Sequence, residues 1–375
     1  MTGHIPSEYF CDRVEETKRL VQEITGRATN ILLMSERRLG KTSLIEHCFE
    51  QPQIKDNFYT FYFDILHTSD FNEFIYEFQK QVFDALMPRG QKVWSSFLQA
   101  VRSVTPKFSV DPLTGMPTFA LELGNITAPE TTLDEILAYL EKADKPCVVA
   151  IDEFQRITRY QEKNIEAMLR GKIQHLSNTR FVFAGSERHI LADMFGSYNR
   201  PFYHSTMVMS LERIDIDVYA NFAQRQFERY EKSIEEDTLH RLYSAFDGNT
   251  FCMQKMLHVA FNKTPIGGIC GLDTINQVLS EILSDNEHAY RENLSRMGVK
   301  QKAVLYAIAI EGVARQVTSV DFITRHSLGT ASSVQAALRV LLENDWITVS
   351  NKEYTLSDKF MSLWLKRQSG NVVAL

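Results

Sequence analysis

The stretch from Ile31 to Leu44 constrains the fold of this chain more than any other part of the sequence. It reads Ile-Leu-Leu-Met-Ser-Glu-Arg-Arg-Leu-Gly-Lys-Thr-Ser-Leu. The apolar run at 31–34 is typical of a strand that is covered on both faces. Gly40, Lys41 and Thr42 match the end of the phosphate-loop signature G-x-x-x-x-G-K-S/T. The sequence therefore predicts a buried strand, a phosphate-binding loop and the start of a helix.

This loop has the chemistry to hold the phosphates of ATP. Its backbone N–H groups and the N-terminus of the following helix form a cradle for phosphate. Lys41 places a cation on the β- and γ-phosphates, and the Thr42 hydroxyl is a ligand for Mg²⁺. Ser35 replaces the first glycine of the signature, where a glycine is easier if φ must be positive. The predicted nucleotide-binding residues of the loop are Ser35, Glu36, Arg37, Arg38, Leu39, Gly40, Lys41, Thr42 and Ser43.

A second apolar strand, Cys147 to Ile151, ends in Asp152 and Glu153. In phosphate-loop ATPases such a strand lies beside the first one. Its Asp holds the hydration shell of Mg²⁺, and the next Glu polarises the attacking water. Each motif alone has an ordinary explanation, a chance Gly-Lys-Thr or a strand that ends in two solvated acids. The two motifs in this order favour an ATPase site, with Asp152 at the metal and Glu153 as the base.

Strands alternate with helices over residues 1–210, which predicts a mainly parallel sheet covered on both faces. Further strands are expected at 58–63 and 180–184, and an edge strand at 207–211. Ligands bind at the carboxyl ends of such strands. Ser186 follows the strand at 180–184, where it serves as a sensor of the γ-phosphate, as a helix N-cap, or as both.

Residues 104–128 interrupt this alternation. Two short β-rich stretches flank Pro112 to Gly115, a pattern that predicts a hairpin with a glycine turn. Such an insertion serves either as a surface flap or as an oligomer contact, and the sequence does not choose between them.

From residue 211 the pattern is helical. Residues 211–299 predict a small helical lid, and residues 300–367 predict three helices and a two-stranded wing, followed by a tail at 368–375. This is the winged-helix form of helix-turn-helix, whose third helix enters the major groove of DNA. The alternative is a winged helix used for protein contacts. The residues expected to contact DNA are Ser332, Ser333, Gln335, Arg339 and Lys352.

Composition bounds the class of protein. A chain of 375 residues is long enough for two or three domains. The net charge of −6 argues against a general nucleic-acid coat protein. The five cysteines are scattered and lack C-x-x-C spacing, which indicates a reducing compartment, taken to be the cytoplasm, and argues against a zinc site. No apolar run approaches the ~20 residues needed to span a membrane, and no signal peptide is expected.

The motifs together resemble the archaeal-type ATPase family of the AAA+ and STAND group of P-loop ATPases. The strings that carry the resemblance are Phe10-Cys11-Asp12-Arg13, the loop from Ser35 to Leu44, Ile151-Asp152-Glu153-Phe154-Gln155, Phe183-Ala184-Gly185-Ser186-Glu187 and, in the helical region, Asp247-Gly248-Asn249-Thr250-Phe251.

The resemblance implies an AAA+-like α/β fold with a lid and a winged helix, and it implies ATP and Mg²⁺ as ligands. By match, Lys41, Glu153 and Ser186 carry catalysis, while Thr42 and Asp152 serve Mg²⁺. Arg13 belongs to a segment that is expected to lie against the adenine, or else to an ordinary first helix. Many relatives carry an arginine near 201–205, and the candidates for it are His204, Arg200 and Arg188.

The leading hypothesis is a Mg²⁺-dependent ATPase of low turnover that works as a regulatory switch. One alternative is a DNA-binding initiator or regulator that ATP gates without significant turnover. Another is a protein-interaction scaffold with a structural nucleotide. Self-association or a protein partner is compatible with each hypothesis, and no membrane partner is expected.

Overall fold

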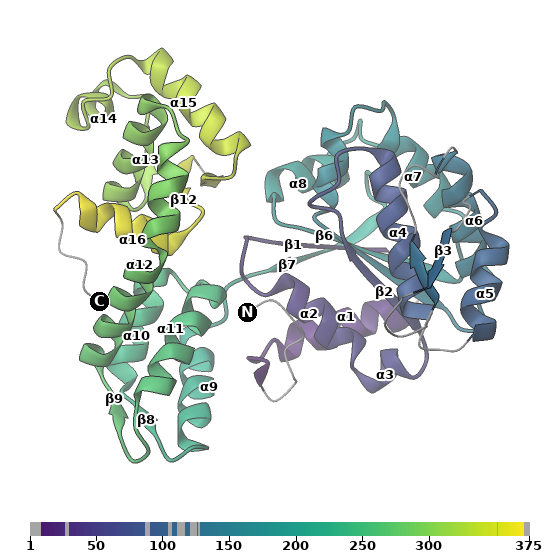
Figure 1. Ribbon diagram of the computed structural model, residues 1–375, viewed down its shortest axis with the longest axis horizontal. Coiled ribbons are helices and arrows are strands. Elements are labelled where there is room, and N and C mark those ends of the chain that lie inside the picture. Colours follow the sequence, from purple (N-terminus) through teal and green to yellow (C-terminus); the bar gives the residue numbers. More distant parts are fainter. Residues whose placement is uncertain are drawn as a thin grey trace. The chain divides into compact units, whose positions relative to one another are not determined.

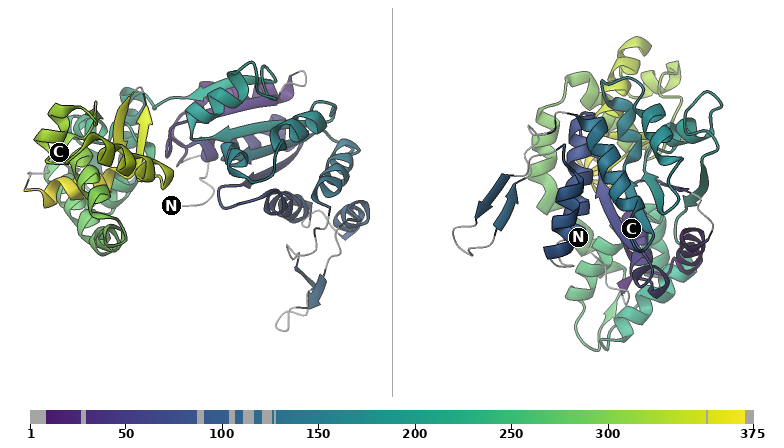
Figure 2. Two further views of the ribbon diagram at one scale, coloured as in Figure 1. Left: turned by 90° about the horizontal axis from the view of Figure 1, so that it is seen from above. Right: turned by 90° about the vertical axis from the view of Figure 1, so that its right-hand side faces the viewer.

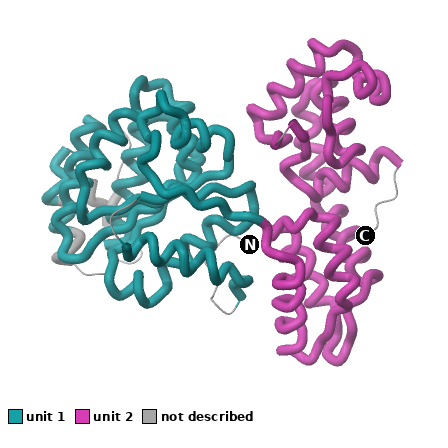
Figure 3. The backbone as a smooth tube through the Cα atoms, turned by 180° about the vertical axis from the view of Figure 1, so that it is seen from behind, with its two compact units in different colours: residues 1–212 teal, residues 213–375 magenta. Residues whose placement is uncertain are grey.

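The computed structural model (Figure 1) describes residues 9–26, 30–86, 91–103, 107–110, 117–120, 126, 128–350 and 352–370. The chain divides into two compact units, Met1–Glu212 and Arg213–Leu375 (Figure 3). Across the described ranges, no helix combines the length and apolar character that crossing a membrane requires.

Unit 1 is built on a five-stranded parallel sheet. The strands are β1 (Asn30–Ser35), β2 (Tyr59–Asp64), β5 (Cys147–Asp152), β6 (Thr179–Gly185) and β7 (Thr206–Leu211). Their order is β2-β5-β6-β1-β7. The predicted parallel sheet and the edge position of the last strand are confirmed.

One expectation about this sheet is wrong: the strand that ends in Asp152 does not lie beside the strand of the phosphate loop. β6 lies between them and pairs with both, through Val182 with Ile31 on β1 and with Ala150 on β5. The reason is that β6 is itself an almost fully buried apolar strand. Such a strand fits the centre of a parallel sheet as well as β5 does.

Helices cover both faces of the sheet, because side chains alternate along each strand. Ile31 and Leu33 of β1 pack with α1 (Val14–Thr25), α2 (Lys41–Phe49) and α3 (Pro52–Lys55). Leu32 points to the opposite core. That core is formed with α4 (Phe71–Leu86), α5 (Gln91–Ala100), α6 (Pro129–Glu141), α7 (Ile165–Ile173) and α8 (Arg188–Gly196).

The predicted hairpin is present. β3 (Lys107–Val110) and β4 (Pro117–Ala120) pair antiparallel and form a sheet of their own (Figure 2). The expected turn at 112–115 lies outside the described residues. The sequence did not indicate α5, which precedes the hairpin.

The first part of unit 2 is helical, as expected. It contains α9 (Ile216–Glu228), α10 (Glu236–Phe246), α11 (Thr250–Lys263) and α12 (Leu272–Ser295). Two short strands pair in parallel: β8 (Ser233–Ile234) lies between α9 and α10, and β9 (Ile269–Cys270) lies between α11 and α12. The side chain of Asn249 accepts a hydrogen bond from the Cys252 N–H and caps α11. The α12 helix reaches almost to the predicted end of the lid at residue 299.

The second part of unit 2 is a winged helix. Its helices are α13 (Val299–Glu311), α14 (Val320–Arg325) and α15 (Ala331–Glu343). The wing strands β11 (Ile347–Ser350) and β12 (Glu353–Leu356) are joined by a third strand, β10 (Ala314–Arg315), in the order β10-β12-β11. The third strand and α16 (Lys359–Gln368) were not predicted. On α16, Trp364 packs against Tyr290 of α12, so this helix connects the winged helix to the first part of the unit.

Candidate nucleotide-binding site

The phosphate loop runs from the end of β1 to the start of α2. Gly40 precedes the helix with φ of 89°, in the left-handed region that favours glycine. A Cβ atom at Gly40 would meet nothing within 4 Å, so conformation rather than crowding explains the glycine. Arg38 is also left-handed, with φ of 66°. The α2 helix therefore begins at Lys41 with its N–H groups directed at the loop, which is the geometry of an anion site.

The backbone conformation at Ser35 explains why this loop does not need the first glycine of the signature. It is the last residue of β1, pairs with Leu211 of β7 and is fully buried. It is not among the residues with a positive φ. Its hydroxyl donates to the carbonyl oxygen of Glu36 at 2.9 Å. The backbone at this position is ordinary strand, which any small residue adopts.

Two substitutions in the loop are expected to differ sharply. Gly40→Ala should weaken ATP binding about tenfold, because an L-residue in the left-handed region costs about 1–2 kcal/mol. Ser35→Gly should change the dissociation constant by less than about threefold, since its φ needs no glycine. Calorimetric titration with ATP measures both. Tighter binding by an order of magnitude in Ser35→Gly would contradict this account of the loop.

Asp152 is the most heavily bonded acid at the carboxyl edge of the sheet. It is 2% exposed. Its Oδ1 accepts hydrogen bonds from Lys41 Nζ and from the backbone N–H of Glu153. Its Oδ2 accepts from Thr42 Oγ1 at 2.8 Å and from the Tyr62 hydroxyl at 3.0 Å. Burial by itself raises the pKa of Asp152, but the Lys41 ammonium and these hydrogen bonds outweigh it and lower the pKa.

Glu153 lies beside this pair and is held by the tip of the next strand. Its backbone is left-handed, with φ of 55°, a conformation that is strained for a glutamate. Its Oε2 accepts a hydrogen bond from Ser186 Oγ at 2.9 Å, and its Oε1 lies 3.6 Å from Lys41 Nζ. Arg37 Nε donates to Ser186 Oγ at 3.3 Å. The structure therefore brings the phosphate loop, β5 and β6 together through predicted site residues.

Three residues at this edge were missed. Tyr62 and Asp64 come from the end of β2, which runs beside β5, with Asp64 paired to Asp152. Burial raises the pKa of Asp64, and the charges of Asp152 and Glu153 act in the same direction. Gln155 donates to Glu153 Oε2. The signal for β2 was available, because its predicted strand ends in an acid at the same sheet edge.

Arg13 contacts the loop from the segment before α1. Its guanidinium is buried, donates to the Leu39 carbonyl at 3.2 Å and pairs with Glu16 at 2.8 Å. Nearby in sequence, Phe10 stacks on His47 of α2, with ring centroids 4.1 Å apart. These contacts fasten the N-terminal segment to the loop and to α2. A contact of Arg13 with nucleotide stays a prediction.

The candidates for an arginine finger lie elsewhere. Arg200 pairs with Glu166 at 2.7 Å and with Asp193 at 3.4 Å. Arg188 lies 3.4 Å from Glu212. His204 has φ of 49°, and its ring packs against Tyr203 at 4.2 Å between centroids. These contacts join neighbouring parts of unit 1, and a role for any of the three in catalysis stays a prediction.

In the winged helix, the predicted DNA-binding residues lie on α15 and at the wing. Ser332, Gln335, Arg339 and Lys352 are exposed, and Ser333 is half-buried with its hydroxyl bonded to the Thr330 carbonyl. The Arg339 guanidinium lies 3.8 Å from Glu343.

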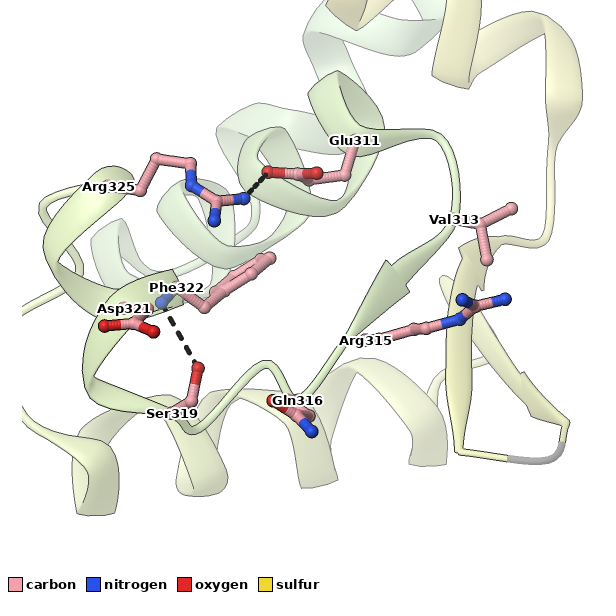
Figure 4. Close-up of a pocket in the computed structure, with 8 residues that line it drawn as sticks. All are labelled: Glu311, Val313, Arg315, Gln316, Ser319, Asp321, Phe322 and Arg325. Carbon is pink, nitrogen blue, oxygen red and sulfur yellow. Dashed lines mark hydrogen bonds and ion pairs between the residues drawn. The ribbon is translucent and has the colours of Figure 1, made fainter.

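A separate hollow of about 450 Å³ lies at α13, β10 and α14 (Figure 4). None of the five predicted DNA residues lines it. Its arginines are already paired, Arg325 with Glu311 and Arg315 with Glu353. The hollow thus offers little unpaired positive charge to a ligand.

A phosphate loop, a strand that ends in two acids and a parallel sheet of this order define a P-loop nucleotide-binding protein with a C-terminal winged helix. The chain belongs to the family described as an ATPase domain predominantly from Archaea, whose sequence model matches residues 10–256. A second model, described as a probable winged helix domain, matches residues 288–367. A comparison with curated proteins found no match.

Solved structures resemble the whole chain. The Walker-type ATPase of Pyrococcus abyssi is 18% identical, with a TM-score of 0.65 over 98% of this chain and 99% of that one. The ORC2 protein of Aeropyrum pernix, solved in ADPNP–ADP complexes, is 12% identical, with a TM-score of 0.57 over 99% and 98% of the chains. The ORC1 protein of the same organism, solved in complex with DNA, is 11% identical, with a TM-score of 0.51 over 98% and 95%. At such identities the likeness shows the fold alone.

Proposed function

We propose that this protein hydrolyses ATP slowly in a Mg²⁺-dependent reaction and works as a nucleotide-driven regulatory switch. The observation that carries the proposal is the meeting of Lys41, Asp152 and Glu153 at the start of α2 and the end of β5. All three are connected by hydrogen bonds or close approach. P-loop ATPases use a lysine and acidic residues in such an arrangement for phosphoryl transfer.

Each residue has a role in this reaction. Lys41, which bonds to Asp152, turns to the β- and γ-phosphates when ATP binds. Glu153 accepts the proton of the attacking water. Ser186 hydrogen-bonds to both Arg37 of the loop and Glu153. It can therefore sense the γ-phosphate and change the position of the base when that phosphate is lost.

The donor set at Asp152 fits Mg²⁺. This ion is usually held by one or two carboxylates together with substrate phosphates and water. Asp152 has a lowered pKa and accepts from Thr42 Oγ1 on the side of the loop. Mg²⁺ would neutralise charge on the phosphates there, with Thr42 as a direct ligand and Asp152 acting through water. Among the described residues no cluster of three or more His, Cys, Asp or Glu could hold a metal alone. The phosphates are therefore needed to complete the site.

The switch is tested by steady-state hydrolysis with Mg²⁺, with and without double-stranded DNA. Turnover that DNA raises would couple the ATPase to the winged helix. A rate of ATP hydrolysis that does not change with DNA would favour a switch that responds to a protein or small-molecule signal. ADP that stays bound and never exchanges, without any turnover, would overturn the proposal in favour of a scaffold with a structural nucleotide. The five cysteines are buried thiols rather than disulfides, which supports the proposed reducing, cytoplasmic setting.

The second candidate function is binding of duplex DNA, as an initiator or regulator gated by ATP. It is favoured by a winged helix whose α15 face exposes Gln335 and Arg339. Arg339→Ala should weaken binding and reduce the slope of log K against log salt by about one, because one phosphate contact is lost. Fluorescence anisotropy at several salt concentrations measures this.

Arg296→Ala is a matched control for that experiment. Arg296 follows α12, is similarly exposed and pairs with Glu292 four residues earlier, as Arg339 pairs with Glu343. It should leave binding unchanged. Absence of duplex binding at low salt with both ATP and ADP would rule out the DNA function.

A further inference from the structure

Gln155 is a buried amide that contacts the predicted base. It lies in a short 3₁₀ helix, Phe154–Arg159, that follows Glu153, and it is 1% exposed. Its Nε2 donates to Glu153 Oε2. Its own Oε1 is buried and accepts no hydrogen bond from the described residues. An amide kept in the core with half of its polar atoms unsatisfied is costly for stability, so a functional reason for it is expected.

The neighbouring strand leaves room for this amide. Gly185 ends β6, and a Cβ atom there would lie 2.0 Å from Gln155 Oε1 and 2.8 Å from Leu191 Cδ1. The backbone of Gly185 has no positive φ that would itself favour glycine. The space required by the Gln155 side chain therefore explains why glycine stands at the end of β6.

The contacts of Glu153 divide between its two carboxylate oxygens. Oε2 accepts hydrogen bonds from both Ser186 and Gln155, on the side of β6. Oε1 is the oxygen nearer Lys41, on the side of the phosphate loop. Two donors on one oxygen fix the rotation of the carboxylate, so the other oxygen faces the place where the phosphates bind.

We propose that Gln155 is a positioning residue that orients Glu153 so that Oε1 accepts the proton of the attacking water. The proposal rests on the ATP hydrolysis proposed above. In that step the water oxygen bonds to the γ-phosphorus as the bond from that phosphorus to the β,γ-bridging oxygen breaks. The bond's electron pair leaves with ADP, and the water proton passes to Glu153 Oε1 and then to solvent. In this proposal Gln155, whose Nε2 also lies 3.5 Å from Glu187 Oε1, acts on the reaction through Glu153.

The test is Gln155→Ala, studied by steady-state kinetics and ATP titration. The expected result is a fall in kcat of about tenfold to a hundredfold, since small misplacements of a catalytic group have effects of this size. KM and the dissociation constant for ATP should stay at the native values, because the phosphate loop is untouched. In a Glu153→Gln background the same substitution should cause no further loss, because the base that it positions is already absent.

Two further variants separate positioning from a fold defect. Gly185→Ala should reproduce the loss of kcat by displacing the amide, and it should add little to Gln155→Ala. Gln79→Ala removes an equally buried glutamine from α4, away from the site, and should keep native kcat. A thermal melt of each variant checks that it is folded.

The outcomes distinguish this inference from the function on which it rests. Native turnover that Gln155→Ala leaves unchanged or raises would overturn the inference alone. A fall in kcat that is accompanied by an equal loss of ATP affinity would also overturn the inference. So would a further fall in kcat when Gln155→Ala is added to Glu153→Gln. No turnover by the native chain would overturn the proposed function and the inference together.

Discussion

Glu153→Gln is expected to bind ATP with native affinity and to hydrolyse it about a hundredfold or more slowly than the native chain, the scale of a lost general base. The substitution keeps the shape of the side chain. Its amide oxygen still accepts from Ser186, so the network around the phosphate loop survives. What is lost is the ability to take the proton of the attacking water. Parallel measurements of kcat and of the ATP dissociation constant test this expectation.

The exposed pair Glu50 and Lys55 provides the control. Glu50 follows the last residue of α2, and its carboxylate lies 2.9 Å from Lys55 Nζ, away from the site. Glu50→Gln makes the same chemical change as Glu153→Gln at an exposed position and should keep native turnover. Hydrolysis at the native rate by Glu153→Gln would remove Glu153 from the role of base.

Lys41→Ala is expected to weaken ATP binding about tenfold to a hundredfold, because a hydrogen bond to a charged group contributes about 1.5–3 kcal/mol. Hydrolysis should fall at least as far, since the same cation faces the γ-phosphate in the transition state. Lys55→Ala, on the exposed partner of Glu50, should change neither quantity. Native affinity for ATP in Lys41→Ala would contradict the assignment of the phosphate loop.

The same substitution has a consequence for stability. Lys41 is the cation that counters the effect of burial on Asp152 and lowers the pKa of this carboxyl group. Removing one partner of a buried pair costs about 3–5 kcal/mol. In the native chain the lowered pKa contributes stability above the unfolded pKa of about 3.9, and this contribution is lost as the pH falls through the folded pKa. The deficit of Lys41→Ala should thus be largest at neutral pH and shrink in acid.

Local patterns were sufficient to predict most elements of this fold. The apolar run at 31–34 predicted β1, and Gly40-Lys41-Thr42 predicted the start of α2. These signals lie within a few residues of one another, so they do not depend on the rest of the chain. The winged helix was predicted for the same reason, from three helical patterns and two short strands.

Long-range arrangement was harder to predict. The position of β6 between β1 and β5 depends on which buried strand pairs with which, and an apolar run carries no such information. Tyr62 joins the site only because β2 pairs with β5. The roles proposed for Gln155 and Gly185 depend on the distance of one side chain from a neighbouring strand. Tyr62 and Asp64 were therefore missed because strand pairing brings them to the site, and Gln155 was missed, although it stands in a motif, because its contact with Glu153 is seen only in the structure.

The most direct test of the account is single-turnover hydrolysis of ATP by the native chain and by Glu153→Gln, each with Mg²⁺ and with the metal removed by a chelator. The account predicts ADP formation by the native chain with Mg²⁺, and little or none in the other three reactions. ADP formation at the native rate without Mg²⁺, or by Glu153→Gln, would contradict it.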